Sequence, residues 1–446
     1  MRSPVRVNPI TPQRLIDDGS VLERLGNLAA AILILGWTLL CGLVLRRAVF
    51  ATNDSISNYA HVWYVSRQIW HYHRIPFHMP IVGHGKAYAF PYAFVPWASA
   101  ALLRPLLGDW TVTLWLVIGA IGLLTATFWS FPELRRGWWA ACILASPMIV
   151  AGVVLGQLPF LWAIAMLFFA IGSWRRNQFW LALILATLAQ ITHPAVLMPI
   201  TGLLVMIGLH WESSRKKLLL FYGLSVFLAA PAAWLVLTSP VVEDTTTRTQ
   251  AINFIGTVVP RATILLLPFV LLWLQRFQRV WVPIAMFGAL IAGNFMLMPI
   301  IHTGDAARKL DQRPNTALVP YLDSNRFVPG ATYRLLRIGD DKLGMYEILQ
   351  HGGRLDSEFF PESIDRQSWP NTADYAAFLR KRDVGFVVIN YGYDIVYQTN
   401  EHRLLEQMIA SPVLTADGSM CVELYDRMGD LVVYRIRDQC RSTSAD

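Results

Sequence analysis

Acidic residues are scarce in the first two thirds of this chain of 446 residues. Only 9 of its 30 Asp and Glu precede residue 301, whereas 21 of its 38 Lys and Arg do. Between Glu23 and Glu133 the only acids are Asp54 and Asp109. Chemistry that requires two carboxylates in one site, such as that of glycosidases, therefore has few residues to draw on.

Repeats and charges inside apolar runs are scarce as well. Internal repeats and mid-membrane charges are typical of transporters, so a transporter of lipid-linked precursors is disfavoured. His71, His73 and His78 have no cysteine or acid at ligand spacing, so neither a metal site nor a cofactor is expected. Of the four cysteines, Cys41 and Cys142 lie within apolar runs and are interpreted as packing residues.

Apolar residues, by contrast, make up 54% of the chain and gather in long runs. A helix of about 20 residues crosses a hydrocarbon core of about 30 Å, so the sequence predicts a polytopic α-helical membrane protein. The first run begins near Leu25 and follows a tail (residues 1–24) with four arginines. No small-residue cleavage site follows this run. We therefore expect a retained anchor rather than a signal peptide. Basic residues that flank apolar helices indicate membrane orientation and not nucleic-acid binding.

About nine transmembrane helices are predicted within residues 25–301. They are expected at residues 25–48, 111–131, 138–154, 158–173, 178–194, 195–210, 218–238, 261–275 and 280–301. A further apolar run, residues 91–107, contains three prolines and an arginine, which suit an interfacial helix better than a span.

The positive-inside rule supports the same arrangement. If the run 91–107 lies flat on the membrane, four basic clusters share the side of the N-terminal tail: Arg135-Arg136, Arg175-Arg176, Arg215-Lys216-Lys217 and Arg276/Arg279. The tail is then cytoplasmic. The loop 49–110 and residues 302–446 are then extracytoplasmic.

Residues 302–446 alternate strand and helix patterns and predict an α/β domain. Strands are expected at 333–338 and 384–389, helices at 374–381 and 401–410, and a hairpin from the runs 420–425 and 431–436. Cys421 and Cys440 flank this hairpin. They can form a disulfide if the compartment is oxidising.

Three short patches fall on the predicted outer face. Asn53-Asp54 follows the first span and precedes an amphipathic stretch that ends at Pro76. The second patch is Gly83-His84-Gly85-Lys86-Ala87-Tyr88-Ala89-Phe90-Pro91-Tyr92. The third, Gly156-Gln157, is followed by a span, paired arginines, another span and the turn His193-Pro194.

Together these patches resemble the GT-C superfamily of membrane glycosyltransferases over roughly residues 25–210. The chain is similar in particular to bacterial mannosyl- and arabinosyltransferase-like proteins that depend on polyprenyl-phosphate sugars. It also resembles membrane proteins labelled 6-pyruvoyl-tetrahydropterin-synthase-related. In GT-C enzymes an acid of the first outer loop is the general base, and Asp54 matches that position. Asn53 and Gln157 stand where other members carry further acids, so metal dependence is not expected.

The chemistry can also be argued from the residues alone. Inverting transfer of a sugar from a lipid phosphate to a hydroxyl needs one base and cations to neutralise the leaving phosphate. Asp54 is the expected base. Candidates for binding donor phosphate or substrate are Arg46, Arg47, His61, His84, Lys86, Gln157, His193 and Arg261. Arg46 and Arg47 are equally well explained as snorkelling residues, Arg261 as an interfacial anchor, and the histidines as interfacial or capping residues.

The function predicted from these residues is an inverting glycosyltransferase in a bacterial inner membrane. Its donor is a polyprenyl-phosphate sugar from the lipid bilayer, and its acceptor is a hydroxyl of an extracytoplasmic glycan, glycolipid or protein. Asn53 in place of a second acid leaves open a non-catalytic GT-C-like scaffold for cell-envelope assembly. A lipid-linked precursor transporter ranks last. The sequence identifies neither the sugar nor the acceptor.

Overall fold

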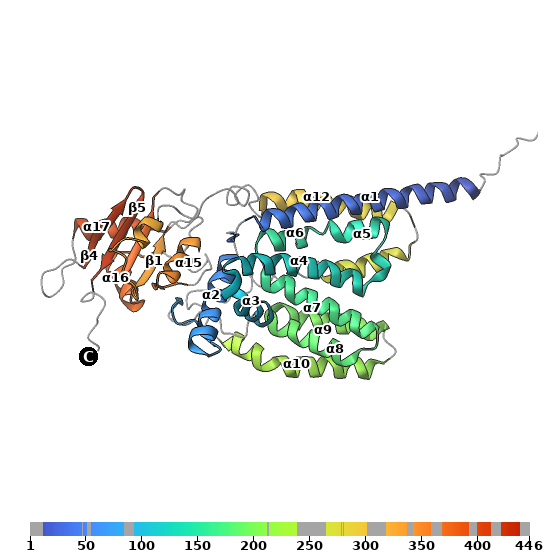
Figure 1. Cartoon of the computed structure of the whole chain (residues 1–446), viewed down its shortest axis with the longest axis horizontal. Helices are drawn as coiled ribbons and strands as arrows, with labels where there is room; N and C mark the ends of the chain where they lie inside the picture. The colour runs from blue at the N-terminus through green and yellow to red at the C-terminus, as the bar shows by residue number, and fades with distance from the viewer. Residues whose placement is uncertain are drawn as a thin grey trace, which may run out of the picture.

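The protein consists of a helical bundle and a smaller domain built on a β-sheet, arranged end to end (Figure 1). The structure is a computed structural model. It describes residues 12–46, 48–50, 55–83, 93–211, 214–238, 265–277, 279, 281–300, 318–336, 342–357, 368–391, 399–411 and 421–437. The bundle precedes the sheet domain in the chain, as predicted.

Apolar helices form the bundle. They are α1 (Pro12–Val44), α2 (Ser55–Tyr72), α3 (Phe94–Leu107), α4 (Trp110–Ser130), the 3₁₀ turn η2 (Pro132–Leu134), α5 (Gly137–Leu144), α6 (Pro147–Val154), α7 (Leu158–Arg175), α8 (Phe179–Thr192), α9 (Pro194–Trp211), α10 (Arg215–Thr238), a helix over Leu265–Gln275, and α12 (Trp281–Ile300). Five segments are long and apolar enough to cross a membrane: Val21–Val44, Trp110–Ser130, Gly137–Val154, Leu158–Arg175 and Arg215–Leu235. A membrane protein is therefore indicated.

The remaining predicted spans coincide with shorter apolar helices, so nine crossings stays a prediction. These helices cover Phe179–Thr192, Leu197–Leu209, Leu265–Gln275 and Trp281–Met296. The predicted span 138–154 is interrupted at Ala145–Ser146, because Pro147 starts a new helix and cannot continue the hydrogen bonds of α5. Of the run predicted at 91–107, residues 94–107 form α3, which lies with α2 at the end of the bundle next to the sheet domain (Figure 1).

Two features of the bundle suit a lipid environment. Apolar stripes face outward, as in α1, where Leu28, Ile32, Leu35 and Leu39 recur at helical spacing and are all more than half exposed. Some polar groups inside the bundle are hydrogen-bonded between helices: the Trp37 Nε1–H donates to the Leu144 carbonyl at 2.9 Å, and the Gln190 amide donates to Ser225 at 3.0 Å. Lipid offers no alternative partner for such groups.

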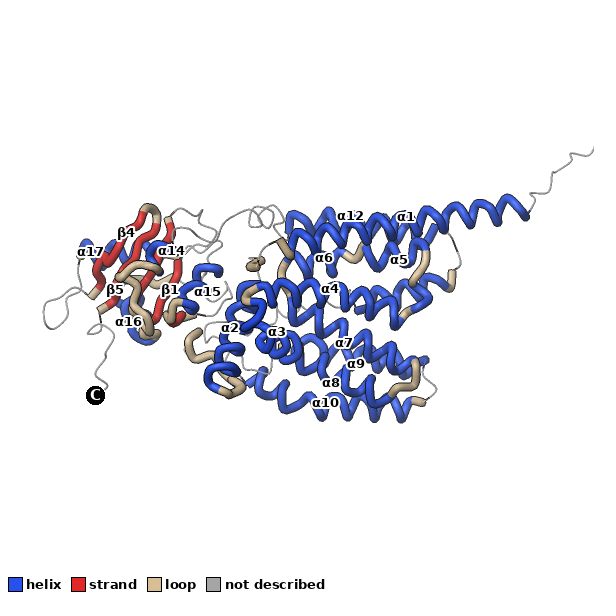
Figure 2. The backbone as a smooth tube through the Cα atoms, in the orientation of Figure 1, coloured by secondary structure: helices blue, strands red, loops and turns tan. Residues whose placement is uncertain are grey.

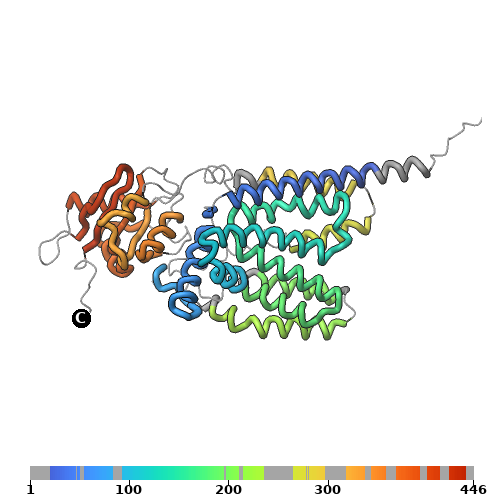
Figure 3. Tube along the Cα trace, viewed as in Figure 1, coloured from blue at the N-terminus to red at the C-terminus, as the bar shows by residue number. Residues whose placement is uncertain are grey.

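The ends of α4, α7 and the helix over Leu265–Gln275 meet at the end of the bundle that lies away from the sheet domain (Figure 3), where Lys217 of α10 also lies 5.3 Å from the centre of the Trp174 ring. There Arg175 pairs with Glu133 at 2.5 Å, and the Gln275 amide donates to the Glu133 carbonyl at 3.2 Å. The Gly137 N–H donates to Asn27 of α1 at 2.8 Å, which places the start of the apolar part of α1 at this end too. The opposite end carries the Gly156-Gln157 and His193 turns.

The C-terminal domain holds a five-stranded sheet in the order β2-β1-β3-β5-β4 (Figure 2). Its elements are α14 (Leu318–Leu322), β1 (Thr332–Leu336), α15 (Lys342–Gln350), β2 (Arg354–Leu355), α16 (Thr372–Lys381), β3 (Phe386–Asn390), α17 (Glu401–Ala410), β4 (Val422–Met428) and β5 (Leu431–Ile436). β1, β2 and β3 are parallel, and β5 runs antiparallel to β3 and β4. The predicted strands, helices and hairpin are confirmed, whereas α14, α15 and β2 were not predicted.

Alternate residues of the central strands point to opposite faces of this sheet, and helices cover both faces. Tyr333 of β1 packs in the same apolar cluster as Tyr346 of α15. Leu336 of β1 and Val387 of β3 pack instead with Tyr375 of α16. Buried strands with this alternation are typical of sheets covered by helices on both sides.

Polar contacts join the C-terminal domain to the segment between α1 and α4, which includes α2 and α3. The Tyr346 hydroxyl of α15 donates to Asp109 at 2.7 Å, and Arg104 of α3 pairs with the same carboxylate oxygen at 2.8 Å. The Leu355 N–H of β2 donates to the Ile81 carbonyl at 2.8 Å, in a parallel bridge. Asp109 therefore has a structural role at this interface.

Candidate active site

The start of α2 packs directly against the Gly156-Gln157 turn. A Cβ on Gly156 would lie 2.5 Å from the Ser55 Cβ, which shows how closely the two backbones approach. The Asn58 side-chain amide donates to the Gly156 carbonyl at 3.0 Å. Gln157 is the N-cap residue of α7. The start of α2 and the Gly156-Gln157 turn, both predicted on the outer face, are thus in contact. The contact on the α2 side is made by Ser55, the residue that follows Asp54.

The residues on both sides of the connection 51–54 are held by hydrogen bonds. Ser55 Oγ donates to the Phe50 carbonyl at 2.5 Å, and the Phe50 N–H donates to the Tyr59 hydroxyl at 2.9 Å. Tyr59 is hydrogen-bonded in turn to Thr113 of α4 at 2.5 Å. The connection that contains Asp54 therefore begins and ends on buried, hydrogen-bonded residues, although Asp54 itself lies outside the described residues.

His61 belongs to a buried aromatic cluster one to two turns into α2. Its ring stacks on Trp97 of α3 at a centroid distance of 4.2 Å, and the Trp97 Nε1–H donates to Asn58 at 2.9 Å. His61 Nδ1 lies 2.6 Å from the Ser57 carbonyl, so this nitrogen carries the proton. Burial lowers the pKa of His61 to about 4, so its imidazole is neutral at pH 7. In this tautomer Nε2 carries no proton, so His61 can accept a hydrogen bond but can offer neither a hydrogen bond nor a positive charge to a phosphate.

His193 occupies the turn between α8 and α9, close to the start of α7. Its ring meets Phe160 edge to face at 5.9 Å, and Phe160 follows Gln157 by three residues. The Ala93 N–H at the start of α3 donates to the Thr192 carbonyl at 3.0 Å. His61, Gln157 and His193 therefore converge on the same end of the bundle as the start of α2.

The other predicted site residues are not placed in this cluster. Arg46 follows the last turn of α1 and is exposed, which fits either of its two interpretations. Arg47, Asp54, His84, Lys86 and Arg261 lie outside the described residues. No group of three or more potential metal ligands occurs within the described ranges. Cys41 and Cys142 are free, and Cys421 is disulfide-bonded; its predicted partner Cys440 is another residue that the structure does not describe.

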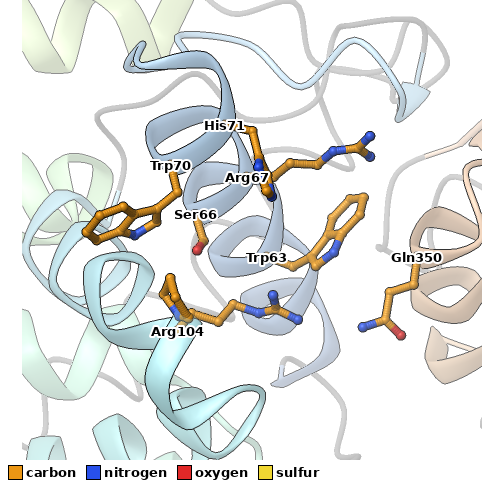
Figure 4. A pocket seen from close by; sticks show the side chains of 8 residues that line it. Trp63, Ser66, Arg67, Trp70, His71, Arg104 and Gln350 are labelled. Carbon is orange, nitrogen blue, oxygen red and sulfur yellow. The ribbon is translucent and has the colours of Figure 1, made fainter.

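A pocket that was not predicted from the sequence lies beside this cluster. It lies between α2, α3 and α15, has a volume of about 450 Å³, and is lined by Trp63, Ser66, Arg67, Trp70, His71, Arg104, Pro105 and Gln350 (Figure 4). A signal was present, because Trp63, Arg67 and Trp70 recur at helical spacing. Tryptophans in this pattern equally suit an aromatic belt at the membrane interface, and Gln350 comes from a helix that was not predicted.

Replacement of Gly156 by alanine tests the contact with Ser55. Gly156 has a φ of +70°, which strains a residue with a Cβ, and the new methyl group would also overlap Ser55. We expect Gly156→Ala to lower the free energy of unfolding by about 2–4 kcal/mol, the sum of strain and overpacking. Calorimetric unfolding of the purified protein measures this loss.

Gly429→Ala is the matched control. Gly429, in the turn between β4 and β5, also has a positive φ, +60°, but nothing lies within 4 Å of its added Cβ. This variant should lose only the strain energy, about 1 kcal/mol. Equal losses in the two variants would show that the Gly156–Ser55 contact does not constrain the start of α2.

Comparison with known proteins gives no family for the chain. No protein-family model matches it, and no curated protein matches it significantly.

Proposed function

We propose that this protein is an inverting glycosyltransferase of the GT-C type. The observation that carries the proposal is the structural role of Asp109, which is bound by Arg104 and Tyr346. Of the two acids between Glu23 and Glu133, this leaves Asp54, which lies outside the described residues, as the candidate base. Ser55, the residue after Asp54, packs against Gly156 at the end of the bundle that faces the C-terminal domain. A single carboxylate at such a position suits one-base transfer chemistry.

The proposed reaction is one direct displacement. Asp54 removes the proton of an acceptor hydroxyl, and that oxygen attacks the anomeric carbon of the donor sugar. The bond between the anomeric carbon and the phosphate oxygen breaks, and polyprenyl phosphate leaves with the electron pair. Gln157 and His193 supply hydrogen-bonding groups near the reacting phosphate. Arg46, Arg47 and Arg261 are the candidate cations that stabilise its charge.

The distribution of basic residues supports an orientation for this reaction. The segments that carry the four basic clusters meet at one end of the bundle, and the C-terminal domain and the Gly156-Gln157 and His193 turns lie at the other (Figure 3). Basic loops favour the cytoplasm. We therefore place the N-terminus in the cytoplasm of a bacterium, the helices in its inner membrane, and the reaction and the C-terminal domain on the extracytoplasmic side.

Transfer by the purified protein tests the proposal. The protein in nanodiscs is incubated with each of a panel of radiolabelled polyprenyl-phosphate sugars and an extract of membrane glycolipids. At least one donor should give a labelled product whose formation requires the extract, and NMR of that product should show the opposite anomeric configuration to the donor. A product that retains the configuration contradicts direct displacement. No product from any donor favours the non-catalytic scaffold instead.

A further inference from the structure

The pocket between α2, α3 and α15 is built jointly by the bundle and the C-terminal domain. Five of its lining residues come from α2, two from α3, and Gln350 is the last residue of α15 (Figure 4). The Tyr346–Asp109 contact one turn earlier in α15 fixes the two parts against each other. Its volume of about 450 Å³ lies within the range of about 300–1,000 Å³ that is usual for small-molecule sites.

The ionisable side chains that line this pocket are all basic: Arg67, His71 and Arg104. Arg67 is exposed, and its guanidinium lies 5.7 Å from the centre of the Trp63 ring, which orients it along the pocket wall. Arg104 is held by Asp109 and Tyr346 through one terminal nitrogen, while its buried Nε–H has no hydrogen-bond partner in the described part of the chain. Guanidinium groups fixed in this way suit a carboxylate or a phosphate.

The uncharged lining residues favour a sugar rather than a bare anion. Trp63 is nearly buried and forms part of the wall, whereas Trp70 is half exposed at the rim. Indole rings offer flat apolar faces for the C–H side of a sugar ring. Ser66 and Gln350 add a hydroxyl and an amide, the kinds of group that fix the orientation of a ligand in a mainly apolar pocket.

We propose that this pocket binds an anionic saccharide, a sugar that carries a carboxylate or a phosphate. The guanidinium groups of Arg67 and Arg104 would bind the anionic group, and Trp63 and Trp70 would contact the ring. We infer further that this saccharide is the acceptor and that its hydroxyl reaches the start of α2. This second step rests on the proposed transferase function. Binding itself does not depend on that function.

Calorimetric titration of the full-length protein in phosphatidylcholine nanodiscs tests binding. The anionic probes are trigalacturonate and mannose 6-phosphate, and the neutral references are the galactose trimer and mannose. We expect at least one anionic probe to bind about tenfold or more tightly than its neutral reference, since charge-assisted hydrogen bonds are stronger than neutral ones. Failure of both anionic probes, or equal binding of the neutral sugars, overturns the proposal.

Variants locate the binding in the pocket. Arg67→Ala and Trp70→Ala change exposed side chains and should each weaken binding about tenfold, whereas Arg403→Ala, at an exposed position of α17, should leave it unchanged. Binding is measured without any sugar donor, which separates this site from the proposed transfer. Unchanged binding in Arg67→Ala overturns the assignment. Displacement of the probe by phosphatidylglycerol added to the nanodiscs would show a lipid-headgroup site instead.

Discussion

Replacement of Arg334 by methionine should unfold the C-terminal domain at far lower denaturant or temperature than the wild type. Arg334 in β1 is almost fully buried and pairs with Asp356 and Glu401, both at 2.6 Å. Methionine would leave two buried carboxylates close together without a cation. We expect a loss of about 3–5 kcal/mol, as for other buried pairs that lose one partner. Hydrogen exchange of the β1 and β3 amides in the full-length protein measures it.

A second arginine pair of the same domain provides the control. Arg437 pairs with Glu423 at 2.6 Å, but the two side chains are 43% and 26% exposed, so solvent and the neighbouring Arg435 can replace the contact. Arg437→Met should therefore cost about 1 kcal/mol or less. Neutralising both acids in the triple variant Arg334→Met/Asp356→Asn/Glu401→Gln should recover part of the lost stability. A loss below about 1 kcal/mol in Arg334→Met would contradict an essential role of this buried network.

The local features of the fold could be predicted because their signals lie within single segments. Long apolar runs predict helices, and the alternating runs around Gly429 predict the β4–β5 hairpin. β2 has only two residues, and its strand character comes from pairing with β1 rather than from its own pattern. α15 does show Met345, Ile348 and Leu349 at helical spacing, but nine residues give a weak periodic signal.

The candidate site was only partly predictable because its parts meet through tertiary contacts. The pattern of the sequence placed the start of α2, the Gly156-Gln157 turn and His193 on one face, and the structure brings their described residues together. The pairing of Asp109 with Tyr346 joins residues 237 positions apart, which no local pattern shows. Burial likewise made His61 neutral, whereas from sequence it had been a candidate to bind phosphate.

Replacement of Asp54 by asparagine should have the largest effect on activity. Asparagine preserves the size of the side chain but replaces one carboxylate oxygen with an NH2 donor, so it cannot accept the proton of the acceptor hydroxyl. General-base catalysis contributes a factor of about 10²–10⁴ to rates, so transfer should fall by about that factor while the donor still binds. Glu406→Gln, which neutralises an exposed acid of α17, is the matched control and should transfer at the wild-type rate.

The role of Asp54 as the general base is tested by single-turnover transfer from a saturating polyprenyl-phosphate sugar, compared between the wild type and Asp54→Asn. Donor binding is measured on the same samples, so that a slow rate cannot be ascribed to an empty site. If Asp54 is the base, we expect unchanged donor binding and a transfer rate lower by about 10²-fold or more in Asp54→Asn. Equal transfer rates in the two proteins would show that Asp54 is not the base and would contradict the proposed mechanism.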